Sequence, residues 1–245
     1  MDSDDRPTGR LLTRRDLVAL LGVSGAALAT GVGFAPPRGR ARGTPLPPCV
    51  ARPEQTEGPY FVDEGLTRAD IRTDPTTGIA VPGTELALTF LVSRVGPGRC
   101  DPLPGALVDI WQCDARGVYS DVVDPRFNTV GRKFLRGNQT TDANGAVRFR
   151  TIYPGWYQGR AVHIHFKIRT AAGGGRTADF TSQVYFDEAI TDRVYQAEHY
   201  GGAGRDRTKN AADRIFQRGG EQLLLTPRPV AGGYEAEFAV GLQLD

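Results

Sequence analysis

Histidine and cysteine are scarce in this chain of 245 residues, which contains three of each. The cysteines Cys49, Cys100 and Cys113 form no CxxC pair, and their spacing argues against a zinc ribbon or a thioredoxin-type redox site. In an oxidising compartment one disulfide can form and one thiol is left over, and the sequence leaves all three pairings open. Three buried free thiols are the alternative.

A strong net charge is also missing. The formal charge is +2, and the excess comes from Arg38, Arg40 and Arg42 near the front of the chain. The rest of the chain is close to neutral, so it lacks the electrostatic attraction for phosphate groups on which nucleic-acid binding depends. The sequence therefore predicts no nucleic-acid partner.

A mildly apolar run extends from Leu17 to Ala35, and Arg14 and Arg15 precede it. A basic segment followed by a short apolar one is typical of a secretory signal, and consecutive arginines indicate the twin-arginine route. We therefore expect residues 1–35 to direct export to the periplasm or the extracellular space, with no stable membrane span after cleavage. The run is also long enough for an uncleaved membrane anchor, which is the alternative.

Residues 36–48 read PPRGRARGTPLPP. Proline blocks helices and central strands, so we expect a linker here, followed by one folded domain over residues 49–245. Short stretches of that domain alternate apolar and polar residues, which is the period of a half-buried strand. The clearest are Glu85–Arg94, Ala106–Cys113, Ala146–Ile152, Val162–Arg169, Ser182–Phe186 and Tyr234–Leu242.

Turn signals separate these stretches, among them Pro104-Gly105 and the run Asp142-Ala-Asn-Gly145. Many short strands with turns between them predict an all-β fold, an antiparallel β-sandwich. A few short helices are expected near the C-terminus, at Glu188–Tyr200 and Asn210–Gln217.

Two of the three histidines, His163 and His165, lie two residues apart in one predicted strand. Side chains alternate across a strand, so both imidazoles are expected on one face, where they suit Zn, Fe, Cu or Ni. Tyr157 follows a Pro-Gly turn just upstream, and Tyr119 follows another turn. A bound cation of high charge can remove a phenol proton, and phenolate suits a hard ferric ion. An accidental HxH pair and half-buried core tyrosines are the alternative interpretation.

The segment Phe149–Ile168, with the sequence FRTIYPGWYQGRAVHIHFKI, resembles the core of the intradiol ring-cleavage dioxygenases. It is most similar to the protocatechuate 3,4-dioxygenase β-chain branch and its secreted twin-arginine relatives. The resemblance covers about residues 49–245. Further similar stretches are Glu54–Tyr60, Leu103–Ser120, Thr181–Phe186 and Asn210–Gly220.

The resemblance implies roles for individual residues. Four ligands of a non-haem Fe(III) ion are implied: Tyr119 and His165 as the equatorial pair, and Tyr157 and His163 as the axial pair. Arg160 matches the catalytic arginine of the family, and Gln183 matches a glutamine near the substrate. Tyr157 would leave the metal and accept a proton from the substrate. The implied reaction uses O2 to cleave a catechol-type ring between its two hydroxyl-bearing carbons, giving a cis,cis-muconate-type diacid.

The chain departs from the family pattern between Tyr157 and His163, where the segment is short and Arg160 is followed by Ala161 instead of proline. This difference bears on the substrate more than on the metal, and bulky, exported or lignin-derived catechols are our hypothesis. The sequence leaves a homo-oligomer open.

Two other functions are alternatives. The turn pattern around these strands also occurs in prealbumin-like β-sandwich modules, which bind partners or form stalks without iron. A cupin-like Fe(II) or Zn(II) hydrolase is the second. It would need a carboxylate with the two histidines, and none lies within the His-Ile-His segment.

Overall fold

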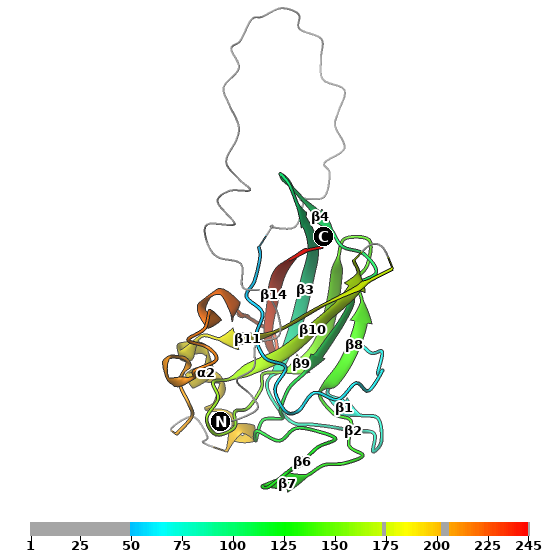
Figure 1. Ribbon diagram of the computed structural model, residues 1–245. Helices are drawn as coiled ribbons and strands as arrows, with labels where there is room; N and C mark the ends of the chain where they lie inside the picture. Colours follow the sequence, from blue (N-terminus) through cyan, green and yellow to red (C-terminus); the bar gives the residue numbers. More distant parts are fainter. Residues whose placement is uncertain (1–49, 173–174, 202–205, 245) are drawn as a thin grey trace, which may run out of the picture.

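The computed structural model describes residues 50–172, 175–201 and 206–244 (Figure 1). The predicted export signal at residues 1–35 and the predicted linker at residues 36–48 lie outside these ranges. Within them, no helix is both long and apolar enough to cross a membrane.

Two five-stranded sheets make up most of the fold. The first has the strand order β12–β11–β10–β5–β8. Its strands are β12 (Leu224–Leu225), β11 (Thr177–Phe186), β10 (His163–Ala171), β5 (Leu107–Trp111) and β8 (Arg136–Thr140). The second has the order β13–β14–β3–β4, and β9 also pairs with β3. Its strands are β13 (Arg228–Val230), β14 (Gly233–Gln243), β3 (Glu85–Gly96), β4 (Arg99–Pro102) and β9 (Ala146–Ile152).

Two short antiparallel pairs lie outside the large sheets. They are β1 (Thr73–Asp74) with β2 (Ile79–Ala80), and β6 (Val123–Asp124) with β7 (Phe127–Asn128). In Figure 1 the β6–β7 pair projects from the body at the bottom of the view. It follows directly on the turn that carries Tyr119.

Aromatic side chains fill the space between the two large sheets. The ring centroid of Phe166 on β10 lies 5.1 Å from that of Phe90 on β3 and 5.7 Å from that of Phe238 on β14. All three side chains are buried. On β3 every second residue from Leu86 to Val92 is buried, as the alternation in the sequence predicts. The core between the sheets therefore fixes which face of each strand is available for function.

The first half of β10 is buried on both faces. Ile164, Phe166 and Ile168 belong to the main core, so the alternating positions His163 and His165 point to the opposite face. Both histidines are nevertheless buried, because loops cover that face. The residues that cover His163 and His165 form the candidate site.

All six predicted strands are present, and the fold is mostly β. The predicted antiparallel pairing is confirmed for most strand pairs. It is wrong for two, because β14 pairs with β3 in parallel and β12 pairs with β11 in parallel. No hairpin joins either pair, so no turn dictates the direction. Residue alternation is the same for both directions, and the sequence pattern therefore does not encode it.

The helix predictions are confirmed only in part. The helix α2 (Glu188–Val194) begins after Asp187, whose side chain caps it, but a turn separates it from the 3-10 helix η2 (Glu198–Tyr200). Asn210–Gln217 is not a continuous helix. Only the short η3 (Asn210–Ala212) forms there, and a further 3-10 helix, η4 (Gly220–Leu223), follows. The carboxylate of Asp213 accepts hydrogen bonds from the next backbone amides and turns the chain.

The cysteines resolve part of the pairing question. Cys113 is a buried free thiol, whereas Cys100 is bonded in a disulfide. The alternative of three free thiols is therefore wrong, and the pairings that include Cys113 are not formed.

Candidate metal centre

Two imidazoles meet at the start of β10. The Nε2 atoms of His163 and His165 are 3.0 Å apart. Two ligands that each lie about 2.1 Å from one metal ion, at a right angle, are roughly 3.0 Å apart, so this spacing fits a shared ion. The Nδ1 atom of His163 lies 2.6 Å from the carbonyl oxygen of Ala161, which orients the ring and leaves Nε2 available as a ligand.

Two interlocked turns bring the tyrosines to these histidines. A Cβ atom on Gly117 would lie 2.2 Å from the carbonyl oxygen of Trp156, and one on Gly155 would lie 2.5 Å from that of Asp114. No other residue permits so close an approach, and Gly117 also has a φ of +83°. The turn before each tyrosine is therefore held against the turn before the other.

The four residues predicted as ligands converge as a result. The ring centroid of Tyr119 lies 5.6 Å from that of Tyr157 and 6.3 Å from that of His165, and Tyr157 lies 5.7 Å from His163. The hydroxyl of Tyr119 is buried and has no hydrogen-bond partner among the residues that the structure describes. Such orphaned atoms are rare in native proteins. A metal ion between the two rings and the two imidazoles would satisfy this oxygen, so the residues present fit a metal.

Burial is the main electrostatic influence on these groups. It raises the pKa of the Tyr119 phenol well above its usual value, and it lowers the pKa of His163 to about 3. Burial likewise lowers the pKa of His165 well below its usual value, and the positive charge of Arg160 adds to the effect at both imidazoles. The imidazoles are therefore neutral, as metal binding requires. Tyr119 would lose its proton only to a cation of high charge.

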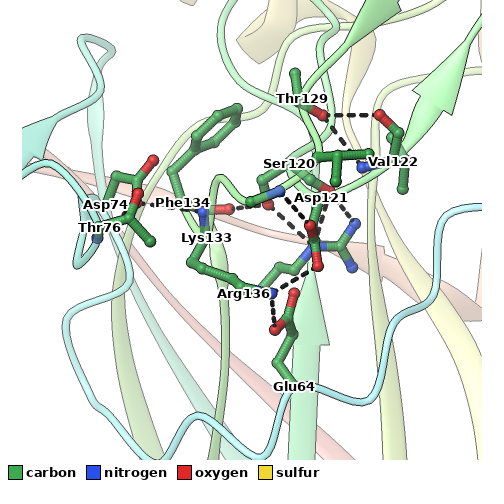
Figure 2. A network of polar contacts seen from close by, with 12 residues as sticks. Glu64, Asp74, Thr76, Ser120, Asp121, Val122, Thr129, Lys133, Phe134 and Arg136 are labelled. Carbon is green, nitrogen blue, oxygen red and sulfur yellow. Dashed lines mark hydrogen bonds and ion pairs between the residues drawn. The ribbon is translucent and has the colours of Figure 1, made fainter.

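A buried polar network fixes the backbone next to Tyr119 (Figure 2). The hydroxyl of Ser120 donates to the carbonyl oxygen of Phe134 at 2.6 Å. The guanidinium of Arg136 donates to both the hydroxyl and the carbonyl oxygen of Ser120. The hydroxyl of Thr129 donates to the carbonyl oxygen of Tyr119 at 2.6 Å. These contacts hold the main chain on the C-terminal side of the phenol ring in one place.

An ion-pair group supports the same turn, and it is also visible in Figure 2. The ammonium group of Lys133 lies 2.6 Å from Asp121 and also pairs with Glu64. Asp121 has a φ of +53°, a left-handed conformation that few residues other than glycine adopt. The hydrogen bond from Lys133 lowers the pKa of Asp121 to about 2, so this pair is charged at neutral pH.

Aromatic rings cover the centre. Tyr60 stacks on Tyr119 with their ring centroids 4.5 Å apart, and Trp111 stacks on His165 at 5.0 Å. The hydroxyl of Tyr60 donates to Asp124 at 2.6 Å. Burial and this carboxylate raise the pKa of Tyr60 to about 12. The sequence predicts no role for Tyr60 or Asp124, because no local pattern marks a contact between segments so far apart.

The predicted catalytic residues Arg160 and Gln183 lie beside this group. Nη2 of Arg160 donates to Oε1 of Gln183 at 2.5 Å, and Nη1 lies 3.4 Å from the hydroxyl of Tyr157. Burial alone would lower the pKa of Arg160, but its interactions with Tyr157, Tyr185 and Asp213 raise it. The guanidinium is therefore a fixed positive charge at the edge of the centre. Asp213 is a second neighbour of Arg160, and no motif in the sequence marks it.

Carboxylates do not complete the centre. In the described ranges, no three side chains of histidine, cysteine, aspartate or glutamate gather into a group that could hold a metal. The triad of two histidines and one carboxylate that a cupin-like hydrolase needs is therefore not formed around His163 and His165. The rings of Tyr119 and Tyr157 instead lie beside His165 and His163.

Comparison with known proteins gives the family. The family profile described as "Dioxygenase" matches residues 56–216, a range that includes all four residues predicted as metal ligands. The chain is 32% identical over 208 residues to the protocatechuate 3,4-dioxygenase β chain of Burkholderia cepacia, covering 80% of this chain and 82% of that protein. The chain belongs to the intradiol ring-cleavage dioxygenases. It is an enzyme of that class, and the prealbumin-like alternative is not supported.

Solved structures agree with this family. The intradiol ring-cleavage dioxygenase of Tetranychus urticae has a TM-score of 0.69 at 32% identity, covering 80% of this chain and 95% of that one. The dioxygenase domain of a carbohydrate-binding fusion protein from Streptomyces sp. SirexAA-E has a TM-score of 0.57 at 30% identity, covering 80% of this chain and 100% of that one. Catechol 1,2-dioxygenase 1 of Acinetobacter lwoffii is 26% identical, over 52% of this chain and only 45% of that enzyme.

The network beside Tyr119 predicts a stability effect. Ser120→Ala removes the donor to the Phe134 carbonyl and one acceptor of Arg136, both in a fully buried place. We expect a loss of about 1–3 kcal/mol in the free energy of unfolding, measured by urea denaturation.

Ser93→Ala is the matched control for this substitution. Ser93 is equally buried, but its hydroxyl lies 3.5 Å from the nearest acceptor, the carbonyl oxygen of Val240, which is too long for a strong hydrogen bond. It should cost clearly less than Ser120→Ala. Equal losses for the two variants would show that the Ser120 hydrogen bonds do not stabilise this turn.

Proposed function

We propose that this intradiol dioxygenase holds a non-haem Fe(III) ion and uses O2 to open a catechol-type ring between its two hydroxyl-bearing carbons. The product would be a cis,cis-muconate-type diacid. The observation that carries the proposal is the convergence of the rings of Tyr119 and Tyr157 with those of His163 and His165. The Tyr119 hydroxyl is buried there and has no hydrogen-bond partner in the part of the chain that the structure describes. Tyr119, Tyr157, His163 and His165 would hold the metal.

The donor set favours a ferric ion. Phenolate is a hard, anionic oxygen donor, and imidazole suits iron as well as softer metals. Two phenolates reduce the charge of a +3 ion to +1, which lessens the cost of placing that ion in a buried site. When bound, ferric iron supplies a Lewis acid that chelates the catechol and withdraws electron density from its ring.

The protein groups around the metal have distinct tasks. Tyr157 would hold the metal and is also the better candidate for a base, because its hydroxyl already lies 3.4 Å from Arg160. Its oxygen would accept a proton from a catechol hydroxyl, which is a general-base role. The guanidinium of Arg160 then faces the reacting ring and stabilises negative charge that develops on it. Gln183 holds Arg160 at 2.5 Å, so we assign it an orienting role.

The reaction itself provides the first test. Iron-loaded enzyme supplied with ¹⁸O2 and catechol should form a ring-opened diacid that contains both labelled oxygen atoms. A product cleaved beside the two hydroxyl-bearing carbons, or O2 consumption with release of hydrogen peroxide, would contradict the proposal.

Parallel assays with catechol, protocatechuate and a catechol with a bulky ring substituent test our hypothesis on substrate size. Faster turnover of the two small compounds would count against that hypothesis.

A single substitution tests the ligand set. Tyr119→Phe removes one anionic donor without changing the shape of the ring, so we expect the protein to lose its bound iron or its colour, together with its turnover. Iron content by elemental analysis and the visible spectrum are the measurements.

Tyr195→Phe serves as the control for this variant. Tyr195 is also buried, but its hydroxyl donates to the carbonyl oxygen of Pro154. It should keep iron and colour. Full activity in Tyr119→Phe would show that this residue is not a ligand.

We also propose that residues 1–35 direct export by the twin-arginine route, supported by Arg14 and Arg15 ahead of the apolar run. The variant with Arg14→Lys and Arg15→Lys should accumulate inside the cell, whereas Arg38→Lys with Arg40→Lys in the linker should be exported normally. Cell fractionation distinguishes them. Undiminished export of the first variant would contradict the route, and a full-length protein that stays in the membrane fraction would favour the anchor.

A further inference from the structure

The guanidinium of Arg160 is held closely at Nε and Nη2 and more loosely at Nη1. Its Nε donates to Oδ2 of Asp213 at 3.1 Å, and its Nη2 donates to Gln183 at 2.5 Å. Its Nη1 lies 3.4 Å from the hydroxyl of Tyr157, which is long for a hydrogen bond. The two short contacts therefore aim Nη1 at the metal centre, where a substrate would find it.

The carboxylate of Asp213 is itself rigidly held. Its Oδ2 also accepts from the backbone amide of Ala161 at 2.8 Å. Its Oδ1 accepts from the amides of Ile215 and Phe216 at 2.7 and 3.3 Å. With four N–H donors around two oxygens, and an exposure of only 1%, this side chain has one orientation. It joins the segment after η3 to the chain just before His163.

The other partner of Arg160 is anchored to the same segment. Nε2 of Gln183 donates to the carbonyl oxygen of Thr56 at 3.0 Å. The hydroxyl of Tyr185 lies 3.0 Å from Oε1 of Gln183 and 2.8 Å from Oε1 of Gln55. Nε2 of Gln55 then donates to the carbonyl oxygen of Ile215 at 3.0 Å. These contacts connect Gln183 to the same turn that carries Asp213, so both partners of Arg160 are held by one segment.

We propose that Asp213 is a positioning residue for the reaction, whose carboxylate fixes Arg160 so that Nη1 faces the metal-bound substrate. This inference rests on the proposed function, in which Arg160 stabilises charge on the reacting ring. Contacts at both Nε and Nη2 restrict the position of the guanidinium more than one contact would. That position matters, because misplacement of a reacting group by about 1 Å can cost on the order of 100-fold in rate. The ion pair also offsets the cost of burying the guanidinium.

An amide in place of this carboxylate would not serve equally well. Asparagine presents one oxygen and one NH2 group, so it cannot accept from both pairs of N–H donors that surround Asp213. It also removes the negative charge next to Arg160. Asp213→Asn should therefore release the arginine without touching any predicted metal ligand.

The experiment is a double-mutant cycle with Asp213→Asn, Arg160→Met and the double variant, all loaded with iron. We expect Asp213→Asn to keep its iron and its visible band, to bind catechol anaerobically, and to lose roughly 10- to 100-fold in kcat with little change in KM. In the Arg160→Met background the same substitution should have no further effect on kcat, because Asp213 acts through the arginine.

Asp142→Asn is the matched control, since Asp142 also accepts hydrogen bonds from two backbone amides in a turn, but on the surface. It should leave kcat unchanged. The cycle is repeated with Asp213→Glu, which keeps the charge and shifts the oxygens by one methylene, so that a failure of Asp213→Asn to fold does not end the test. Its loss should likewise vanish in the Arg160→Met background.

Two results would overturn the inference. One is an unchanged kcat in a folded Asp213 variant. The other is an equal loss with and without Arg160, which would make Asp213 a purely structural residue. Wild-type enzyme that binds no iron or has no turnover would instead overturn the proposed function, and this inference with it.

Discussion

The centre depends on the contact between two glycine turns, in which Gly117 lies against Trp156 and Gly155 lies against Asp114. Each tyrosine follows one of these turns within two residues. Any side chain on either glycine would push the turns apart and separate the two phenols. The packing of main chain on main chain therefore sets the spacing that a shared metal ion would need.

The spacing of the two phenols also depends on buried polar contacts around the turn after Tyr119. The turn after Tyr119 must not move, and the hydrogen bonds from Arg136 to Ser120 and from Thr129 to the main chain hold it. The histidines need no such loop, because β10 places them. Next to Tyr157, Arg160 brings a positive charge into the protein, and Asp213 balances it. Side-chain hydrogen bonds to the main chain thus hold the turn after Tyr119, and a buried ion pair holds the charge of Arg160.

The sequence predicts the strand that carries the histidines, but it does not predict the long-range contacts of the site. Alternation predicts β10 and places His163 and His165 on one face, because strand geometry is local. The two tyrosines could be assigned only through the family resemblance, since no spacing rule links residue 119 to residue 157. The pairing of Tyr60 with Asp124 and of Arg160 with Asp213 depends on long-range packing, which leaves no periodic signal.

The errors have equally specific causes. The segment Asn210–Gln217 has residues that suit a helix, but the side chain of Asp213 binds the backbone amides that a helix would use. Tertiary contact with Arg160 therefore outweighs local preference at this point. The parallel pairing of β3 with β14 was missed because the two strands are far apart in the sequence and residue alternation does not encode the direction of their pairing.

The most direct test of the central claim, a ferric ion shared by two tyrosines and two histidines, is the visible spectrum of the purified enzyme together with its iron content. Phenolate bound to Fe(III) gives a strong red-brown charge-transfer band, which Fe(II) and Zn(II) sites lack. The account predicts about one iron per chain and a band that shifts when catechol is added without O2. A folded, metal-supplemented protein that stays colourless, or a band that does not respond to catechol, would contradict it.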